Sequence, residues 1–128
     1  MPVYLNQDDA LALWRDALSA SVRGDGPDLS VRQMAILLTV YTQTPPHTVR
    51  GLAELLNVSK PAITRAVDRL SEFGLLRRKT DENDRRSILL QRTVRGSVFL
   101  REYGELIVAA AAADSEANQE ASGLPRRF

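Results

Sequence analysis

Residues 49–90, VRGLAELLNVSKPAITRAVDRLSEFGLLRRKTDENDRRSILL, decide the fold of this chain. Two helices that cross closely need a small residue at the crossing and a turn residue that tolerates a left-handed backbone. Ala53 is the small residue, Asn57 suits the left-handed position, and Ile63 lies where it closes the core between the helices. The spacing therefore predicts a helix-turn-helix.

The second helix of this pair has a clear start, a buried face and an end. Ser59 is a good N-cap, and Pro61 lies in the first turn, where its missing N–H costs nothing. Apolar residues recur at intervals of three and four and predict the buried face: Ile63, Ala66, Val67, Leu70 and Phe73. Gly74 is expected to end the helix.

A short basic hairpin is predicted next. Its strands are Leu75–Lys79 and Ser87–Gln91, joined by a turn at Thr80–Asp84. The hairpin is crowded with positive charge from Arg77, Arg78, Lys79, Arg85 and Arg86. Such charge is typical of a wing that lies along DNA phosphates or inserts an arginine into a minor groove. The alternative is a solvated edge hairpin whose charges prevent aggregation.

The same stretch resembles the MarR-type winged helix-turn-helix transcriptional regulators of bacteria. The runs VSKPAITRAVDRL, GLLRR and DENDRR match that family's pattern in order and spacing. A looser resemblance extends to Leu29–Tyr41 and Thr93–Ala113. It implies a homodimer that binds a pseudo-palindromic duplex. Typical members are longer and add a further helix that completes an interlocked dimer, and this chain departs from them there.

The helix position and the resemblance together predict which residues contact DNA. The N-terminal half of the second helix is expected to enter the major groove, with the wing along the backbone. The predicted contacts are Thr48, Ser59, Lys60, Pro61, Ala62, Thr64, Arg65, Arg69, Arg77, Arg78, Arg85 and Arg86.

Four of the charged side chains receive more specific predictions. Arg65 is expected to contact a guanine. Arg69 either reaches a phosphate or pairs with an acid of its own protein. Asp68 is expected to hold an arginine in place, with Arg86 of the wing as the candidate.

In the wing, Arg85 is the predicted minor-groove residue, braced by its neighbours. The resemblance favours this, because family members carry an Asp-Arg pair where this chain has Asp84 and Arg85. Arg77 and Arg78 alternate faces along a strand, so only one of them is expected to meet DNA directly. For Arg50, beside a helix start, a phosphate contact and simple solvation both remain open.

Charge supports the same segment as the DNA-binding surface. The whole chain has a net charge of +1, yet residues 49–95 carry eleven basic and six acidic side chains, and the segments on either side are each net −2. Counterion release would favour duplex binding there. No signal peptide or run of ~18 apolar residues is visible, so a cytoplasmic protein is expected, with no membrane partner.

The predicted fold class is mainly α (α+β), a winged helix-turn-helix with flanking dimerisation helices. A single domain is expected over 1–128: flanking helices at about 6–24 and 93–114, a DNA-binding core at about 30–91 with its wing at 75–91, and a mobile tail at 115–128. The helices of the core start at Ser30, which forms a capping box with Gln33, and at Thr48.

The two flanking helices are expected to form a two-fold dimer. Their predicted dimer contacts are Leu11, Trp14, Leu18, Phe99, Tyr103 and Leu106. The alternative is a monomer in which these helices only cover the winged unit. The resemblance also implies a small-molecule effector, for which Trp14, Arg15, Tyr41, His47 and Tyr103 are the candidates, although apolar residues at helical spacing are more often plain core.

Enzyme functions are excluded by what the sequence lacks. It has no cysteine, and its single histidine, His47, cannot make a recognisable metal site. No phosphate-binding glycine loop is present. No catalytic residue, metal or cofactor is therefore predicted. The expected function is a bacterial transcriptional repressor, and the alternative is a winged-helix protein-interaction or oligomerisation module.

Overall fold

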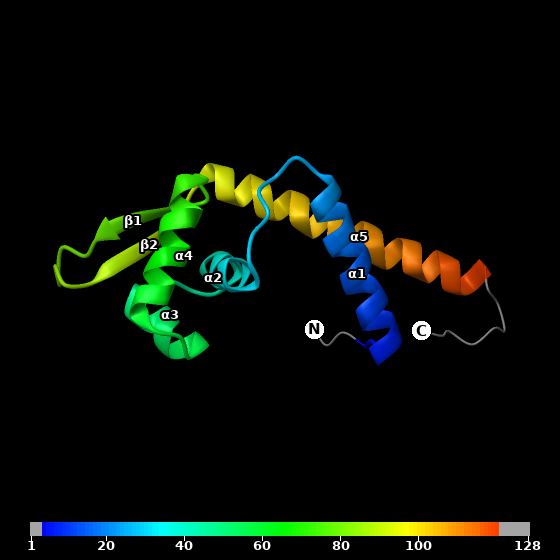
Figure 1. The fold of residues 1–128 in the computed structure, drawn as a ribbon, viewed down its shortest axis with the longest axis horizontal. Coiled ribbons are helices and arrows are strands. Elements are labelled where there is room, and N and C mark those ends of the chain that lie inside the picture. Colours follow the sequence, from blue (N-terminus) through cyan, green and yellow to red (C-terminus); the bar gives the residue numbers. More distant parts are fainter. Residues whose placement is uncertain (1–3, 121–128) are drawn as a thin grey trace. The chain divides into compact units, whose positions relative to one another are not determined.

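The structure is a computed structural model that describes the backbone of residues 4–120 and the side chains of residues 4–113. Five helices and one hairpin follow one another along the chain (Figure 1). Their bounds are α1 Gln7–Arg23, α2 Val31–Thr42, α3 Val49–Leu56, α4 Lys60–Glu72, β1 Leu76–Thr80, β2 Ile88–Arg92 and α5 Val94–Glu120. This confirms the predicted mainly helical fold with a small two-stranded sheet.

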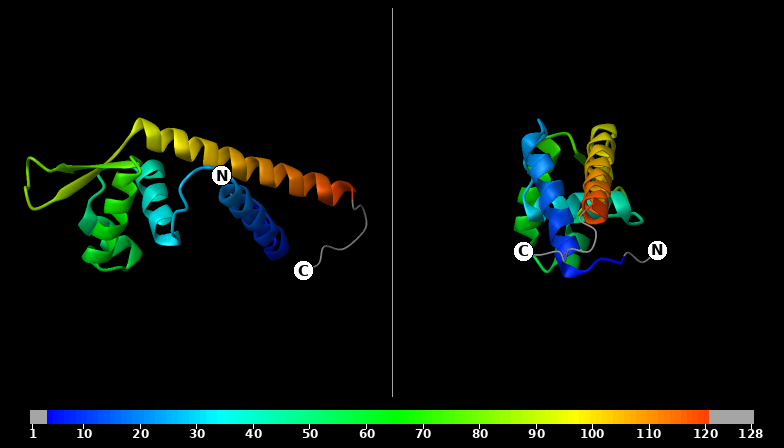
Figure 2. Two further views of the ribbon diagram at one scale, coloured as in Figure 1. Left: turned by 45° about the horizontal axis from the view of Figure 1, so that its top comes forward. Right: turned by 90° about the vertical axis from the view of Figure 1, so that its right-hand side faces the viewer.

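The chain divides into two compact units. One contains residues 29–100, and the other contains residues 1–28 together with residues 101–128. The first unit holds α2, α3, α4, the hairpin and the first turns of α5. Figures 1 and 2 show that the hairpin projects from this unit beyond its helices.

The core of residues 29–100 is apolar and joins all three of its complete helices to the hairpin. Its buried members are Ile36, Leu37, Val40, Leu52, Ala53, Ile63, Ala66, Val67, Leu70, Leu75, Leu76 and Leu90. The predicted buried face of α4 supplies the largest share of this set. Full burial of a valine, leucine or isoleucine side chain stabilises a fold by about 1.5–3 kcal/mol.

The turn between α3 and α4 has the predicted geometry. Asn57 adopts φ 54° and ψ 48°, in the left-handed region. The backbone N–H of Val58 then donates to the carbonyl of Ala53 at 3.0 Å. Ala53 and Ile63 are both buried, as the close crossing of two helices requires. The helix-turn-helix prediction is confirmed.

The helix starts also match their predictions. Side chains of Asn6, Thr48 and Ser59 cap α1, α3 and α4 by accepting backbone N–H bonds. Ser30 and Gln33 form both hydrogen bonds of a capping box, at 3.1 and 2.9 Å. Each cap satisfies donors that a helix leaves unpaired at its N-terminus, so these boundaries are local properties of the sequence.

Both strands lie one residue later than predicted, and the end of α4 explains the later start of β1. Gly74 has a φ of 76°, its N–H donates to the Ser71 carbonyl at 2.9 Å, and the Leu75 N–H donates to the Leu70 carbonyl at 2.9 Å. These are the two bonds of a Schellman motif. Because they use the Leu75 amide to close the helix, β1 begins at Leu76 rather than Leu75.

The C-terminal helix is longer than predicted. It was expected to end near residue 114 with a mobile tail beyond, but α5 continues to Glu120. Residues 114–120 contain no glycine or proline, so no helix-breaking residue interrupts this part of α5. The part of the predicted tail at 121–128 lies outside the described residues.

Candidate nucleic-acid interface

Helix α4 presents a polar face opposite its buried one. Ser59 Oγ accepts the Ala62 N–H at 3.3 Å and sets the start of the helix, so that Lys60, Pro61 and Arg65 are exposed. Thr64 is half-buried beside them. Ala62 fits the predicted DNA contacts less well, because this residue is only 7% exposed. It lies directly before Ile63 at the edge of the buried face and serves packing.

Asp68 holds an arginine of the wing, but not the predicted one. It forms an ion pair with Arg78 of β1, whereas Arg86 lies near Asp84 of its own loop. The pairing with Arg78 follows from packing, because β1 runs directly from the end of α4 and contacts it. Arg78 and Asp68 thus connect the wing to the second half of α4.

Arg69 pairs within its own protein, which was one of its two predicted roles. Its Nη1 donates to Glu72 Oε2 at 2.8 Å, and its guanidinium carbon lies 4.6 Å from the centre of the Phe73 ring. Both contacts draw the side chain toward the C-terminal end of α4. Arg65 therefore remains the better candidate for a base contact on this helix.

The wing is an antiparallel hairpin with a compact loop. Its register pairs Leu76 with Arg92 at the base and Thr80 with Ile88 near the loop. Within the loop, Asp81 N–H donates to the Ser87 carbonyl at 3.0 Å, and Ser87 N–H donates to the Asp84 carbonyl at 2.9 Å. These bonds give the loop a defined shape.

The wing arginines differ in how they are held. Arg77 Nη2 donates to Gln91 Oε1 across the hairpin at 2.9 Å, and Arg78 is held by Asp68. Arg85 is exposed, and no hydrogen-bond or ion-pair partner for it occurs among residues 4–113. Of the predicted wing contacts, Arg85 is therefore the one most free to reach a ligand.

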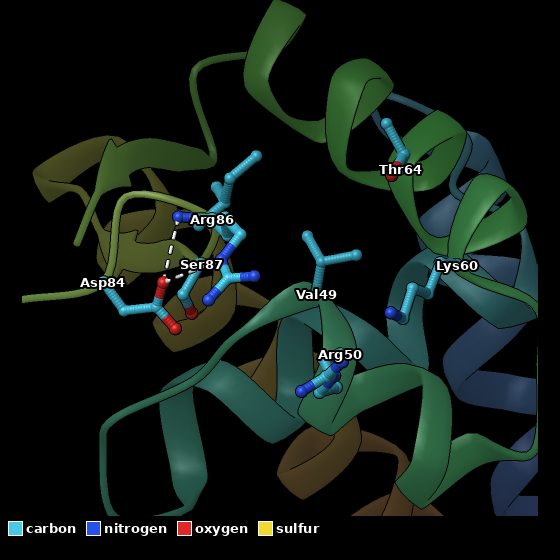
Figure 3. A pocket seen from close by; sticks show the side chains of 8 residues that line it. Val49, Arg50, Lys60, Thr64, Asp84, Arg86 and Ser87 are labelled. Carbon is cyan, nitrogen blue, oxygen red and sulfur yellow. Dashed lines mark hydrogen bonds and ion pairs between the residues drawn. The ribbon is translucent and has the colours of Figure 1, made fainter.

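A groove joins the starts of α3 and α4 to the wing loop. It has a volume of about 380 Å³ and is lined by Val49, Arg50, Lys60, Thr64, Asp84, Arg86, Ser87 and Ile88. Figure 3 shows Val49 at its centre, with Arg86 and Lys60 to either side of it. The sequence left the role of Arg50 open and did not indicate Ser87 as a site residue, because only the tertiary fold brings α3 beside the wing.

Tyr41, a candidate for an effector site, makes hydrogen bonds that hold the fold together. Its hydroxyl donates to the Leu75 carbonyl at 2.6 Å and accepts the Thr93 N–H at 2.8 Å. Thr93 Oγ1 in turn donates to the Gly74 carbonyl at 2.7 Å and accepts the Gly96 N–H at 2.9 Å. This cluster, the Tyr41–Thr93 joint, attaches the start of α5 to the end of α4.

The other effector candidates are divided between the two units. His47 belongs with Tyr41 to residues 29–100, and its Nε2 lies 3.1 Å from the Gln43 carbonyl oxygen. Trp14, Arg15 and Tyr103 belong to the other unit, where Arg15 pairs with Asp16 at 2.9 Å. An effector site that joins the two sets therefore stays a prediction.

Two features of the described residues bear on other functions. No helix within them is both long and apolar enough to cross a membrane. Nor do the described residues contain a group of three or more His, Cys, Asp or Glu side chains arranged to hold a metal ion.

A helix-turn-helix followed by a basic hairpin defines a winged helix-turn-helix protein, and comparison with known proteins specifies the family. The model of the MarR family matches residues 29–88. Residues 29–88 are therefore similar to the MarR family.

One curated relative is similar in sequence, and two solved structures share the fold. The chain is 32% identical over 79 residues to the HTH-type transcriptional regulator PecS of Dickeya dadantii (strain 3937). The match covers 60% of this chain and 48% of PecS, so this chain spans about half the length of that relative. Transcriptional regulator Tm0710 from Thermotoga maritima has a TM-score of 0.64 at 25% identity, over 91% of this chain and 75% of that one. A mutant MarR from E. coli, solved with operator DNA, has a TM-score of 0.62 at 23% identity, over 84% and 71%.

Proposed function

We propose that this protein is a sequence-specific, DNA-binding transcriptional regulator. One observation carries the proposal: α4 exposes Lys60, Pro61 and Arg65 on the face opposite its core, beside a basic hairpin. A helix presented in this way fits the major groove, and a hairpin beside it reaches the backbone or the neighbouring minor groove. The net charge of +5 on residues 49–95 supports the same partner.

Within this proposal the residues have different roles. Arg65 contacts a base edge, and Arg85 enters the minor groove. Lys60, Thr64 and Arg86 contact the backbone. Arg77, Arg78 and Arg69 act at most through their partners, because each is held by another side chain of the protein.

A homodimer is part of the proposal. Helix α1 carries an apolar row, Leu11, Trp14, Leu18 and Val22, at spacings of three and four, and each member is at least 40% exposed in the single chain. A second copy that covers this row would remove a large apolar area from water and set two reading helices on one duplex. Two predicted dimer contacts fit less well, because Tyr103 is only 8% exposed and Phe99 packs against the winged-helix core.

We further propose that the protein is a cytoplasmic repressor. It would bind a pseudo-palindromic operator and respond to a small-molecule effector. These features rest on the resemblance to MarR-type regulators and on the solved complex of a MarR mutant with operator DNA. Each of these features can be tested once DNA binding has been demonstrated.

The test is selection of duplexes from a randomised pool, followed by fluorescence anisotropy of the selected and a scrambled duplex at two salt concentrations. We expect the selected duplex to bind ~10³-fold or more tightly than the scrambled one, with a steep salt dependence. Equal, weak binding to both would overturn sequence specificity. No binding at either salt concentration would favour a protein-interaction module. Sedimentation of the protein alone tests the dimer.

A further inference from the structure

The groove between α3, α4 and the wing collects cations from three separate elements. Arg50 comes from the first turn of α3, Lys60 from the start of α4 and Arg86 from the wing loop. The hydroxyl groups of Thr64 and Ser87 line the same space. Three basic groups and two hydroxyls around one small groove are the donor set that an oxyanion requires.

The acidic side chain in the groove does not balance these cations. Asp84 Oδ1 accepts the Arg86 backbone N–H at 3.1 Å and lies 3.9 Å from Arg86 Nε. The Arg86 side chain is nevertheless 97% exposed, so this contact holds it only loosely. One carboxylate against three cations leaves a net positive groove, which favours an anionic ligand.

The framework of the groove is rigid although its charged side chains are exposed. Thr48, the N-cap of α3, forms a β-bridge with Leu89 of β2, and the Leu90 N–H donates to the His47 carbonyl at 2.8 Å. The start of α3 is therefore attached directly to the wing. Helix α4, the third element that lines the groove, is held in place by its buried contact with α3.

The position of the groove selects the ligand. When α4 lies in a major groove and the wing reaches the neighbouring minor groove, the strand backbone that separates the two grooves must pass between α4 and the wing. The groove occupies that position in the protein. A phosphodiester of the duplex is thus brought to the cations by the same docking that the proposed function requires.

We infer that this groove binds one backbone phosphate, and that Arg50 and Arg86 share it. The inference rests on the proposed DNA binding and adds an assignment that α4 and the wing alone do not suggest. A shared phosphate makes the two arginines energetically dependent on each other: when one is lost, the phosphate is held less closely and the other contributes less. The reading helix and the wing then bind DNA as coupled elements.

A double-mutant cycle tests this dependence on whichever duplex the wild-type protein binds. The variants are Arg50→Gln, Arg86→Gln and the double variant, with Arg85→Gln as a matched control, since Arg85 is in the same loop but does not line the groove. We expect each groove variant to weaken binding about tenfold and to reduce the magnitude of the salt slope by ~0.9. Arg50→Gln with Arg86→Gln should weaken binding less than the product of the two single effects, whereas Arg50→Gln with Arg85→Gln should be multiplicative.

A methylphosphonate scan along the duplex gives a second readout. At one position, replacing the phosphate with an uncharged methylphosphonate should weaken DNA binding by the wild-type protein. The same replacement should have little further effect on DNA binding by the Arg50→Gln variant. Multiplicative effects in the groove pair, or no such position in the scan, would overturn the inference while leaving duplex binding intact. If the wild-type protein binds no duplex, the proposed function fails and the inference fails with it. Duplex binding by the wild-type protein thus distinguishes failure of the inference alone from failure of the proposed function. Unchanged thermal unfolding of the variants confirms that they are folded.

Discussion

Removal of one oxygen from the Tyr41–Thr93 joint should measurably destabilise the residue 29–100 unit. The Tyr41 hydroxyl donates to the Leu75 carbonyl at 2.6 Å and accepts the Thr93 N–H at 2.8 Å, both in partly buried surroundings. Tyr41→Phe keeps the aromatic ring and its packing but leaves these two backbone groups without that partner. The variant therefore isolates the hydrogen bonds.

The magnitude follows from the two lost bonds. A hydrogen bond within a protein contributes about 1 kcal/mol net, and a buried group left unpaired is penalised by about 1–3 kcal/mol. Because the site is only partly buried, water can replace some of the loss. We expect Tyr41→Phe to lower the free energy of unfolding by about 2–3 kcal/mol.

Urea unfolding followed by circular dichroism measures this change, with Tyr4→Phe as the control. Tyr4 is 89% exposed, so its variant should stay within about 0.5 kcal/mol of the wild type. Both should be measured at several protein concentrations, because association would add its own stabilisation. A Tyr41→Phe variant as stable as the Tyr4→Phe control would refute the assignment of the joint.

Three further predictions concern the local geometry, and each is tested by urea unfolding. In Gly96→Ala the added Cβ would clash with the Tyr41 hydroxyl and the Leu75 carbonyl oxygen, so we expect a loss of about 1–3 kcal/mol. In Gly104→Ala the added Cβ meets nothing within 4 Å, so this variant should stabilise α5 by about 0.5–1 kcal/mol. Equal effects of the two variants would contradict the close packing at Gly96. Asn57→Ala should destabilise by about 1–2 kcal/mol because of its left-handed backbone, and Asn57→Gly should not; a stable alanine variant would argue against that turn. Asp68→Asn breaks an exposed ion pair and should cost less than about 1 kcal/mol, a loss that high salt reduces; a loss of several kcal/mol would show that the pair is more than a surface contact.

Much of the winged helix could be predicted because its signals are local. A helix cap involves residues three positions apart, as Ser30 and Gln33 show. The left-handed turn at Asn57 depends on its own backbone and on its nearest neighbours. The buried face of α4 follows from the period of the helix. Each of these interactions is contained in a few consecutive residues, so the sequence displays it directly.

Predictions about which side chains meet were less successful. Asp68 was assigned to Arg86, yet it pairs with Arg78, because the path of β1 away from α4 decides which arginine comes near. The hydrogen bonds of Tyr41 were not predicted: its hydroxyl bonds to Thr93, a residue 52 positions away. Contacts over such separations depend on the packing of several elements at once, and no pattern along the chain records them.

The sequence by itself therefore determined the order of helices and strands, their caps, the basic segment and the family resemblance, because each depends on residue types at short, regular spacing. Only the tertiary structure decided that Arg50, Lys60 and Arg86 line one groove and that α5 is attached through Tyr41. Bringing together cations from three elements requires the β-bridge between Thr48 and Leu89 and the closed core beneath it. Those are properties of the folded chain, where residues far apart in sequence become neighbours through packing.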